Sequence, residues 1–376
     1  MFKNFPFLVK SFFFFFTSFF IRKKYDVVFY YPQHFNRGME HENSFFTPLI
    51  DTCKKNNLRY ILIEEPDYNS NSKRNKDAVY FDFIFVIILV LRKLFSTEMN
   101  VITKDHKIGR FLSKTIFFNI KFDHVVTISQ SMVSIFRGLN KDCNIYDVQH
   151  GIIHNNKPNY ILNNKAEPNL VDNNVNLLLG GKAFQKLLID NEDLNYFKEH
   201  TFVVGSGNNN LEKMHHSFNT NVLITLQFTH DHSDKENTIL LNELKAFVSS
   251  ADTKVNFYLK HHPRFNNEVD LSEILELPNI HFASDDLNEC FKLCSLHATT
   301  YSTSTFEAAL LGIPTILIHS QNQLNFFKIE FIYPLSYDIS DFKDTTVYQK
   351  SAEIVKSWAK EYYSPYNELA FLELLK

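Results

Sequence analysis

A basic motif in the second half of the chain combines side chains that could bind a phosphate. The run Lys260-His261-His262-Pro263-Arg264 directly follows an apolar stretch of strand length. Imidazole and guanidinium groups can neutralise the charge that develops on a departing phosphate. A solvated basic loop is the alternative. We predict that Lys260, His262 and Arg264 contact a phosphate.

A second motif is the hydroxyl-rich run YSTST at residues 301–305, which precedes Glu307 and a helical pattern. Unpaired backbone N–H groups and the dipole at the start of a helix favour an anion. We therefore predict Ser302, Thr303 and Ser304 as phosphate ligands and Glu307 as a nucleotide contact. Alternatively, Ser304 and Glu307 form a capping box that serves only their own helix.

The first half of the chain offers candidates for proton transfer. His150 lies in Gln149-His150-Gly151 after a predicted strand, and histidine is the side chain best suited to proton transfer near neutral pH. The polar loop at residues 32–38 leads to Glu40 and Glu42. This loop could contact an acceptor, with either carboxylate as the base, although an exposed loop explains it equally well. The candidate bases are His150, Glu40 and Glu42.

Several common site types are not indicated. His230-Asp231-His232 and His215-His216 lack a third ligand at a recognisable spacing, so we expect no metal site. The sequence contains no Walker loop, no Gly-x-Ser-x-Gly motif, and no Gly-x-Gly-x-x-Gly after the first strand. A net charge of −3, without a basic and aromatic stretch, argues against nucleic-acid binding.

The elements that position these motifs alternate between strand-length apolar runs and helical patterns, which favours parallel sheets covered by helices. A length of 376 residues suits two domains, and a Gly- and Asn-rich stretch at 205–221 marks the boundary. We predict an α/β fold of two doubly wound domains facing a central cleft, at 25–205 and 220–340, with C-terminal helices at 341–376 packing back across both. The predicted strands are 26–31, 60–63, 124–128, 144–148, 176–179, 202–204, 222–226, 254–259, 280–282, 296–298 and 315–318.

The first 24 residues contain a phenylalanine tract with basic residues on both sides. Residues 11–21 would rise only about 16 Å as a helix, whereas a bilayer core is about 30 Å thick. The basic end of the tract does not fit a signal-peptide cleavage site. Two interpretations remain: a segment lying in the membrane interface, or a helix covering a domain surface. We predict that a second apolar run, at 83–91, is buried core.

Taken together, these motifs resemble those of a known class of enzymes. His262-Pro263 after a strand, the hydroxyl cluster with Glu307, and Gly312-Ile-Pro resemble the nucleotide half of bacterial surface-polysaccharide glycosyltransferases of the GT-B fold. Similar His-Pro and Ser/Thr pairs occur in bacterial sialyltransferases, in Kdo transferases, and in transferases that polymerise glycerol phosphate from CDP-glycerol. Gln149-His150-Gly151 is similar to a motif of capsule-synthesis proteins. The resemblance covers the second domain well and the first in outline.

The resemblance implies roles for individual residues. His262 would contact the donor phosphate with help from Ser302 and Thr303, and Glu307 would lie near the nucleotide. Retaining members often carry two glutamates at a fixed spacing, and Thr299 stands where the first would be. This departure favours an inverting mechanism, in which a base deprotonates an acceptor hydroxyl that attacks the anomeric carbon. No metal is needed if His262, Arg264 and helix dipoles hold the leaving phosphate.

We therefore expect a bacterial glycosyltransferase of capsule, O-antigen or lipooligosaccharide synthesis. Its nucleotide-sugar would be a substrate and no further cofactor would be needed. Its acceptor would be a glycan or lipid-linked glycan, and its location would be the cytoplasm or the inner face of the cytoplasmic membrane. A CDP-glycerol or CDP-ribitol phosphotransferase, a sugar-nucleotide epimerase, and a non-catalytic scaffold of a polysaccharide-assembly complex are the alternatives.

Overall fold

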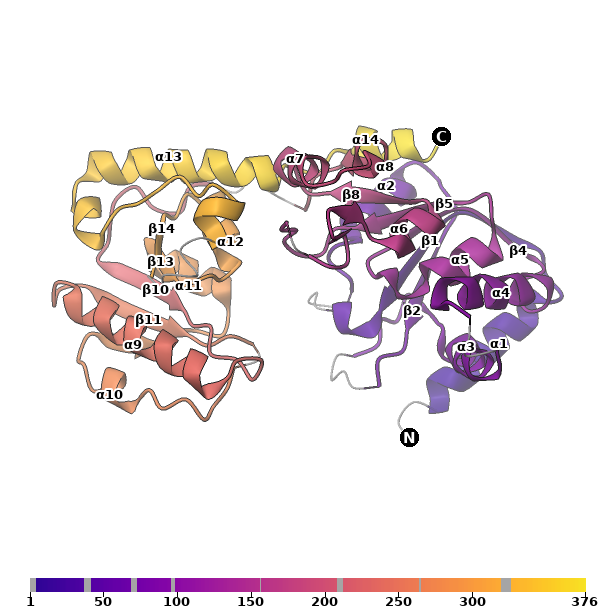
Figure 1. Cartoon of the computed structure of the whole chain (residues 1–376), viewed down its shortest axis with the longest axis horizontal. Helices are drawn as coiled ribbons and strands as arrows, with labels where there is room; N and C mark the ends of the chain where they lie inside the picture. Colours follow the sequence, from indigo (N-terminus) through magenta and orange to yellow (C-terminus); the bar gives the residue numbers. More distant parts are fainter. Residues whose placement is uncertain are drawn as a thin grey trace. The chain divides into compact units, whose positions relative to one another are not determined.

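The chain forms two compact domains in a computed structural model, which describes residues 5–36, 42–68, 73–95, 99–155, 157–207, 212–263, 265–318 and 326–376. Domain 1 comprises residues 1–208 and 364–376, and domain 2 comprises residues 209–363 (Figure 1). The division falls within the Gly- and Asn-rich stretch. Two predicted site residues, Glu40 and Arg264, lie outside the described residues.

Domain 1 is built on a seven-stranded parallel sheet in the order β3-β2-β1-β4-β5-β8-β9. The sequential order of the strands changes direction between β1 and β4, which makes this the switch point of the sheet. In register, Val28 of β1 lies between Ile61 of β2 and Val125 of β4. The strands are β1 (Lys23–Pro32), β2 (Tyr60–Glu65), β3 (Val79–Tyr80), β4 (Ile120–Thr127), β5 (Asn144–Val148), β8 (Val175–Leu179) and β9 (Thr201–Val203), and β6 (Ile161–Leu162) pairs with β7 (Lys165–Ala166) in a separate ribbon.

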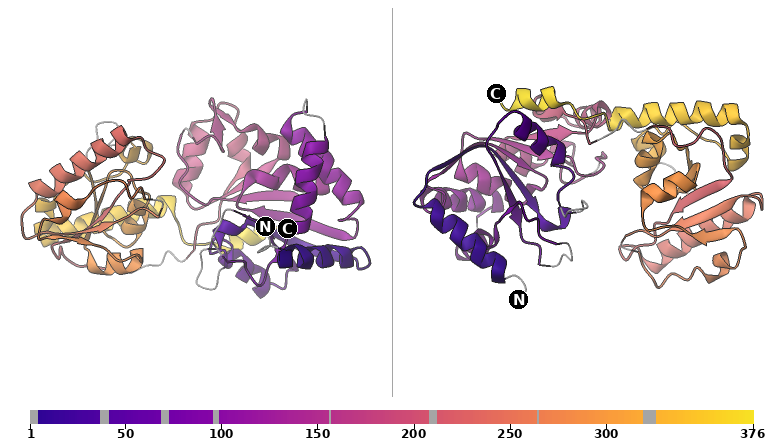
Figure 2. Two further views of the ribbon diagram at one scale, coloured as in Figure 1. Left: turned by 90° about the horizontal axis from the view of Figure 1, so that it is seen from below. Right: turned by 180° about the vertical axis from the view of Figure 1, so that it is seen from behind.

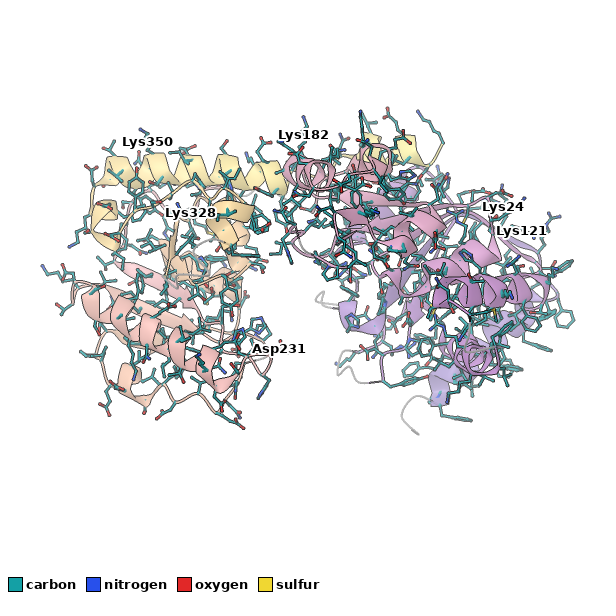
Figure 3. All side chains as sticks on the ribbon, viewed as in Figure 1. Lys24, Lys121, Lys182, Asp231, Lys328 and Lys350 are labelled. Carbon is teal, nitrogen blue, oxygen red and sulfur yellow. The ribbon has the colours of Figure 1, made fainter. Side chains whose placement is uncertain are left out.

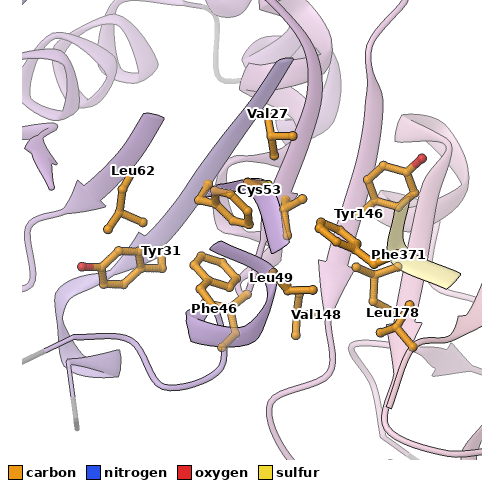
Figure 4. Packing of buried hydrophobic residues seen from close by; sticks show 14 of the residues in the cluster. Val27, Tyr31, Phe46, Leu49, Cys53, Leu62, Tyr146, Val148, Leu178 and Phe371 are labelled. Atoms are coloured by element: carbon orange, nitrogen blue, oxygen red, sulfur yellow. The ribbon is translucent and has the colours of Figure 1, made fainter. Parts of the chain in front are cut away.

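Apolar side chains on both faces of this sheet explain why helices cover both. Val27 and Phe29 of β1 face the buried cluster of Figure 4, which includes Phe46 and Leu49 at the start of α2 (Thr47–Lys55) and Phe371 of α14 (Glu368–Leu374). Tyr30 points to the other face, where its ring meets Phe81 and Phe136. The remaining helices of domain 1 are α1 (Phe5–Ser18), α3 (Asp82–Leu94), α4 (Val101–Lys114), α5 (Val133–Leu139), α6 (Pro168–Asn173), α7 (Lys182–Asp190) and α8 (Tyr196–His200).

Domain 2 repeats this plan with a five-stranded parallel sheet in the order β12-β11-β10-β13-β14, and its switch point lies between β10 and β13. The strands are β10 (Asn221–Thr225), β11 (Asn256–Lys260), β12 (Ile280–Phe282), β13 (Leu296–Thr299) and β14 (Thr315–Leu317). The helices are α9 (Asp234–Ser250), α10 (Ser272–Leu275), α11 (Leu287–Leu293), α12 (Ser304–Leu310) and α13 (Thr345–Tyr362). Figure 2 shows α9 and α13 on opposite sides of this sheet. The predicted doubly wound α/β fold is thus confirmed in both domains.

The phenylalanine-rich start of the chain forms helix α1, which packs on domain 1. Ser11, Phe15 and Ser18 are buried, and the Ser11 hydroxyl accepts a hydrogen bond from the Phe83 amide at 3.1 Å. The interpretation as a helix covering a domain surface is confirmed for this face of α1. No described helix is long and apolar enough to span a membrane.

The prediction that residues 83–91 are buried core is wrong in part. They form α3, in which Ile84 and Ile88 are fully buried. Val86 and Val90, in contrast, are 38% and 51% exposed. A helix on a sheet buries only one stripe of side chains, so an apolar run with no polar interruption leaves an apolar stripe outside.

Candidate functional site

The candidate site of domain 2 lies where the loops after β10, β11 and β13 begin. Strands β11 and β13 pair with β10 on either side, and all are parallel. Their carboxyl ends therefore lie at one edge of the sheet, where β11 and β13 are two strand spacings, about 10 Å, apart across β10. Asp231, labelled in Figure 3, belongs to the loop after β10 at this edge. The structure thus brings the basic and hydroxyl motifs to the same edge of the sheet, on either side of β10.

A buried histidine forms hydrogen bonds to the hydroxyl motif from inside the domain. His297 of β13 is fully buried, and its Nε2 lies 2.9 Å from Thr225 Oγ1 and 3.2 Å from Ser304 Oγ. Its Nδ1 lies 2.9 Å from Thr315 Oγ1. The Ser304 hydroxyl is therefore held in an internal network with β10 and β13. This network gives Ser304 a positioning role and differs from the ligand role predicted for it.

The start of α12 differs from both predictions made for it. Ser302 Oγ accepts hydrogen bonds from the Ser304 amide at 3.3 Å and the Ser304 hydroxyl at 2.8 Å. The amides of Thr305 and Phe306 donate to the carbonyls of Ser302 and Thr303. The predicted Ser304–Glu307 capping box is absent, and the prediction of unpaired N–H groups is wrong for these three amides. Thr303 remains exposed at this edge.

Two other predicted ligands have distinct surroundings. The Lys260 ammonium donates to the carbonyls of Ser284 at 3.1 Å and Asp285 at 2.7 Å, so its charge stabilises the loop after β12. Glu307 is exposed on α12, yet the neighbouring protein partly desolvates its carboxyl and raises its pKa. Its charge also acts on Tyr363, which places the carboxyl near the end of α13.

Aromatic contacts fix the loops around the motifs. The ring of His261 stacks on Phe265 at 4.5 Å and lies 5.2 Å from Phe282, so this side chain packs within its loop. The neighbouring His262, which is half-buried, is the predicted phosphate contact. The Tyr301 hydroxyl lies 2.8 Å from His232 Nε2 and joins the loops after β10 and β13. Sequence reasoning missed this link because no spacing pattern connects residues so far apart.

Burial of His297 predicts an acid-sensitive domain 2. Desolvation lowers the pKa of His297 to about 3, whereas an unfolded histidine has a pKa near 6.5. Below about pH 6.5 only the unfolded state takes up this proton, so stability should fall by about 1.4 kcal/mol per pH unit toward pH 3. The replacement His297→Gln, whose amide can still bond hydroxyls, should remove this slope. Urea unfolding followed by fluorescence of Trp358, the single tryptophan, reports on domain 2.

The matched control is His281→Gln, which alters an exposed histidine of β12 in the same domain. This variant should keep the wild-type pH slope. An unchanged slope in His297→Gln would show that other groups cause the acid sensitivity.

Domain 1 carries two adjoining hollows at the carboxyl ends of β1, β2 and β4. Both are lined by Ser129 and Ser131 of the loop after β4. The first, of about 380 Å³, also has Pro32, His34, Glu65, Pro66, Asp67, Tyr68 and Phe85, and the second, of about 330 Å³, has Gln130, Pro158, Asn159, Glu167 and Asn169. Serine, amide and carboxylate groups beside aromatic rings suit a polyhydroxylated ligand. A hollow of about 470 Å³ in domain 2, beside the end of α9, contains none of the predicted residues.

Ionisable groups line the first of these hollows. Burial raises the pKa of Glu65, whose carboxylate accepts hydrogen bonds from the hydroxyls of Tyr30 and Ser131. His34 Nδ1 lies 2.8 Å from an Asp67 carboxylate oxygen. No sequence pattern marks Glu65 or Asp67, because the loops after β1, β2 and β4 meet only in the folded sheet.

The structure brings His150 to the loop that follows β1. Its ring lies 5.2 Å from the ring of Phe35, so the two predicted acceptor elements are adjacent. Gln149 holds the turn, because its side chain accepts from the Gly180 amide at 2.9 Å and donates to the Gly151 carbonyl at 2.7 Å. Glu42 is half-buried at the end of the same loop.

A carboxyl not identified from the sequence lies on the other side of β5. Asp147 is buried, and the Gln130 side chain donates to its Oδ2 at 3.2 Å. Its Oδ1 has no hydrogen-bond partner within the described part of the chain. Desolvation raises the pKa of Asp147 to about 7, despite the opposing effect of Lys157. An acidic residue inside the apolar strand NIYDV was the available signal.

The arrangement of the strands in the two sheets defines a two-domain α/β protein with a GT-B-like fold. A variant of the wall teichoic acid polymerase TagF is similar, with a TM-score of 0.51 and 12% identity over 93% of this chain and 87% of that one. The UDP-GlcNAc 2-epimerase from Methanocaldococcus jannaschii has a TM-score of 0.49 and 15% identity, over 94% and 98%. At these identities the similarity concerns the fold alone. No protein-family model and no curated protein matches the chain.

The described residues contain no group of three or more His, Cys, Asp or Glu side chains arranged to hold a metal ion. The four cysteines are buried free thiols, two of them in the core beside α11.

Proposed function

We propose that the protein transfers a sugar from a nucleotide-sugar to a hydroxyl of a growing bacterial surface glycan. The observation that carries this proposal is that the His262 loop and the Ser302-Thr303 loop follow strands on either side of β10, at one edge of the sheet beside the switch point of domain 2. Ligands of doubly wound sheets bind at such points, and strands about 10 Å apart place both loops within reach of one diphosphate.

In this proposal domain 2 binds the donor. The His262 imidazole and the Thr303 hydroxyl, with Ser302 and Arg264, donate hydrogen bonds to the leaving phosphate, and Glu307 contacts the nucleotide. Donors fixed before the reaction stabilise charge as it develops, and in many group transfers this effect accounts for most of the rate enhancement. His297 and Ser304 hold the hydroxyl loop in place from below. Lys260 stabilises the loop after β12. In this proposal the reaction needs no metal.

Domain 1 binds the acceptor in the hollows beside Ser129 and Ser131. A base takes the proton of the acceptor hydroxyl, whose oxygen attacks the anomeric carbon. The bond from that carbon to the phosphate oxygen breaks, and the configuration inverts. His150, Glu40 and Glu42 are the bases proposed from the sequence. Asp147 joins them because Gln130, which lines the second hollow, donates to its carboxylate, and because its raised pKa of about 7 suits proton transfer near neutral pH.

A second candidate function is transfer of glycerol phosphate or ribitol phosphate from a CDP-alditol. It is favoured by the similarity to a wall teichoic acid polymerase at a TM-score of 0.51. The same phosphate site would then hold the departing CMP, while the second phosphate would stay with the transferred group. Mass spectrometry of the product separates the two reactions, since one adds a sugar residue and the other a phosphodiester.

The test is binding and turnover of a panel of CMP-, CDP-, UDP- and GDP-linked donors by the full chain. We expect one nucleotide to bind with a dissociation constant below about 1 mM, and its donor to be consumed when acceptor is present. Free buried thiols are consistent with the reducing cytoplasm, where we place the reaction. Absence of binding to every donor would contradict the proposal. In cells, glycan production that survives His262→Ala but not deletion would indicate a scaffold.

A further inference from the structure

The outer face of α1 is an exposed row of aromatic rings. Phe12, Phe13 and Phe16 of α1 are 38%, 58% and 49% exposed, on the side away from the buried Ser11, Phe15 and Ser18. Phe20, two residues after the helix ends, is 76% exposed. Phe16 stacks with Phe12 at 5.6 Å and meets Phe20 at 5.5 Å, so the rings form one continuous strip. We call these four residues the aromatic strip. Exposed apolar surface of this extent marks an interaction site.

The aromatic strip adjoins α3, whose own outer side is also apolar. Phe12 packs edge-on against Phe83 of α3 at 5.1 Å. From there α3 exposes Val86, Val90 and Leu94 to solvent, with Leu94 75% exposed. Two neighbouring helices therefore both present apolar side chains outward, whereas only their inner stripes are needed to cover the sheet. Stability of domain 1 does not explain these outer residues.

The exposed charges of helices α1, α3 and α4 have one sign. The two acidic residues of α1, α3 and α4 are Asp82 and Asp105, and both are buried in ion pairs with Arg74 and Arg92. The exposed charged side chains of these helices are all cationic, namely Lys10, Lys93, Lys107, Arg110 and Lys114. The whole chain, in contrast, has a net charge of −3. The partner must accordingly be both apolar and anionic.

We propose that the aromatic strip and the adjoining side of α3 lie in the interface of an anionic lipid bilayer. Phenylalanine rings would enter the boundary between headgroups and acyl chains, while the lysines and arginines contact anionic headgroups. Helix α1 is 14 residues long, about 21 Å, which suits a helix lying flat and is too short to cross. A second copy of this chain is a poorer partner, because two cationic rims would face each other across the contact.

Flotation of the full chain with phosphatidylcholine vesicles, with and without phosphatidylglycerol, tests this proposal. We expect binding to the anionic vesicles that weakens in high salt. The triple replacement of Phe13, Phe16 and Phe20 by serine should lower the partition coefficient about tenfold or more. Lys10→Gln and Lys93→Gln should each lower it about fivefold on anionic vesicles only, because a basic residue near such a surface contributes about 1 kcal/mol.

The matched control replaces three comparably exposed apolar residues elsewhere in domain 1, Leu162, Val171 and Leu194, by serine. It should bind vesicles as the wild type does, and unchanged circular dichroism would show that both triple variants fold. Equal loss of binding in both variants, or no vesicle binding by the wild type, would overturn the proposal. So would sedimentation showing that the phenylalanine variant only converts a dimer to a monomer.

Discussion

Replacing His262 by alanine should reduce group transfer at least a hundredfold while leaving the fold intact. The side chain is half-buried in the second residue after β11, beside the end of β10 and across from Ser302. Removing one fixed donor to a developing negative charge costs about 10²–10³ in rate. The loss should appear mainly in kcat, since the interaction strengthens as the phosphate leaves. Steady-state kinetics with the donor identified by the nucleotide panel measure the effect.

Two neighbouring histidines serve as controls for that variant. His281→Ala alters an exposed side chain of β12 and should retain wild-type rates. His261→Ala removes a ring stacked on Phe265 and should lower stability through lost packing. Wild-type transfer by His262→Ala would refute the assignment of the phosphate site to this loop. A rise in KM with an unchanged kcat would show that His262 contributes to substrate binding but does not specifically stabilise the departing phosphate.

The sheets could be predicted from the sequence because their strands are short apolar runs separated by helices. Every predicted strand is present within a few residues of its expected bounds. The strands that the sequence does not predict, β3, β6 and β7, have two residues each and no periodicity to detect. The run at 83–91 differs from its prediction as buried core because composition alone does not show which side of a helix faces out.

The candidate site was only partly predictable, because motif reasoning finds residues near strand ends but not their hydrogen bonds. His262, Ser302 and Thr303 lie at the expected edge. Ser304, in contrast, bonds His297 and Thr225 inside the domain. His297 itself has no motif, and its role depends on hydroxyls that three different segments of the chain supply. The same holds for Glu65, which reaches its hollow only through the pairing of β2 with β1.

Replacing Asp147 by asparagine should stabilise domain 1 at neutral and higher pH. Burial raises the pKa of Asp147 to about 7, against about 3.9 in the unfolded chain. Between these values the folded state holds a proton that the unfolded state has released, so stability falls as pH rises from about 4 to about 7. The accumulated loss is about 4 kcal/mol. Asparagine has the same shape and no charge, so its advantage should be greatest near pH 8 and absent near pH 4.

Hydrogen exchange of the β5 amides is the appropriate measurement, because it reports on domain 1 and excludes the opposite pH dependence that His297 gives domain 2. Asp142→Asn, at an exposed carboxyl before β5, is the control and should change the exchange free energy by less than about 0.5 kcal/mol. A gain for Asp147→Asn that is equal at every pH would refute the raised pKa.

A residue that costs stability at the working pH is retained where activity needs it. A stabilised variant without transfer activity would therefore favour Asp147 as the base. A stabilised variant that keeps its activity would leave His150, Glu40 and Glu42 as the candidate bases.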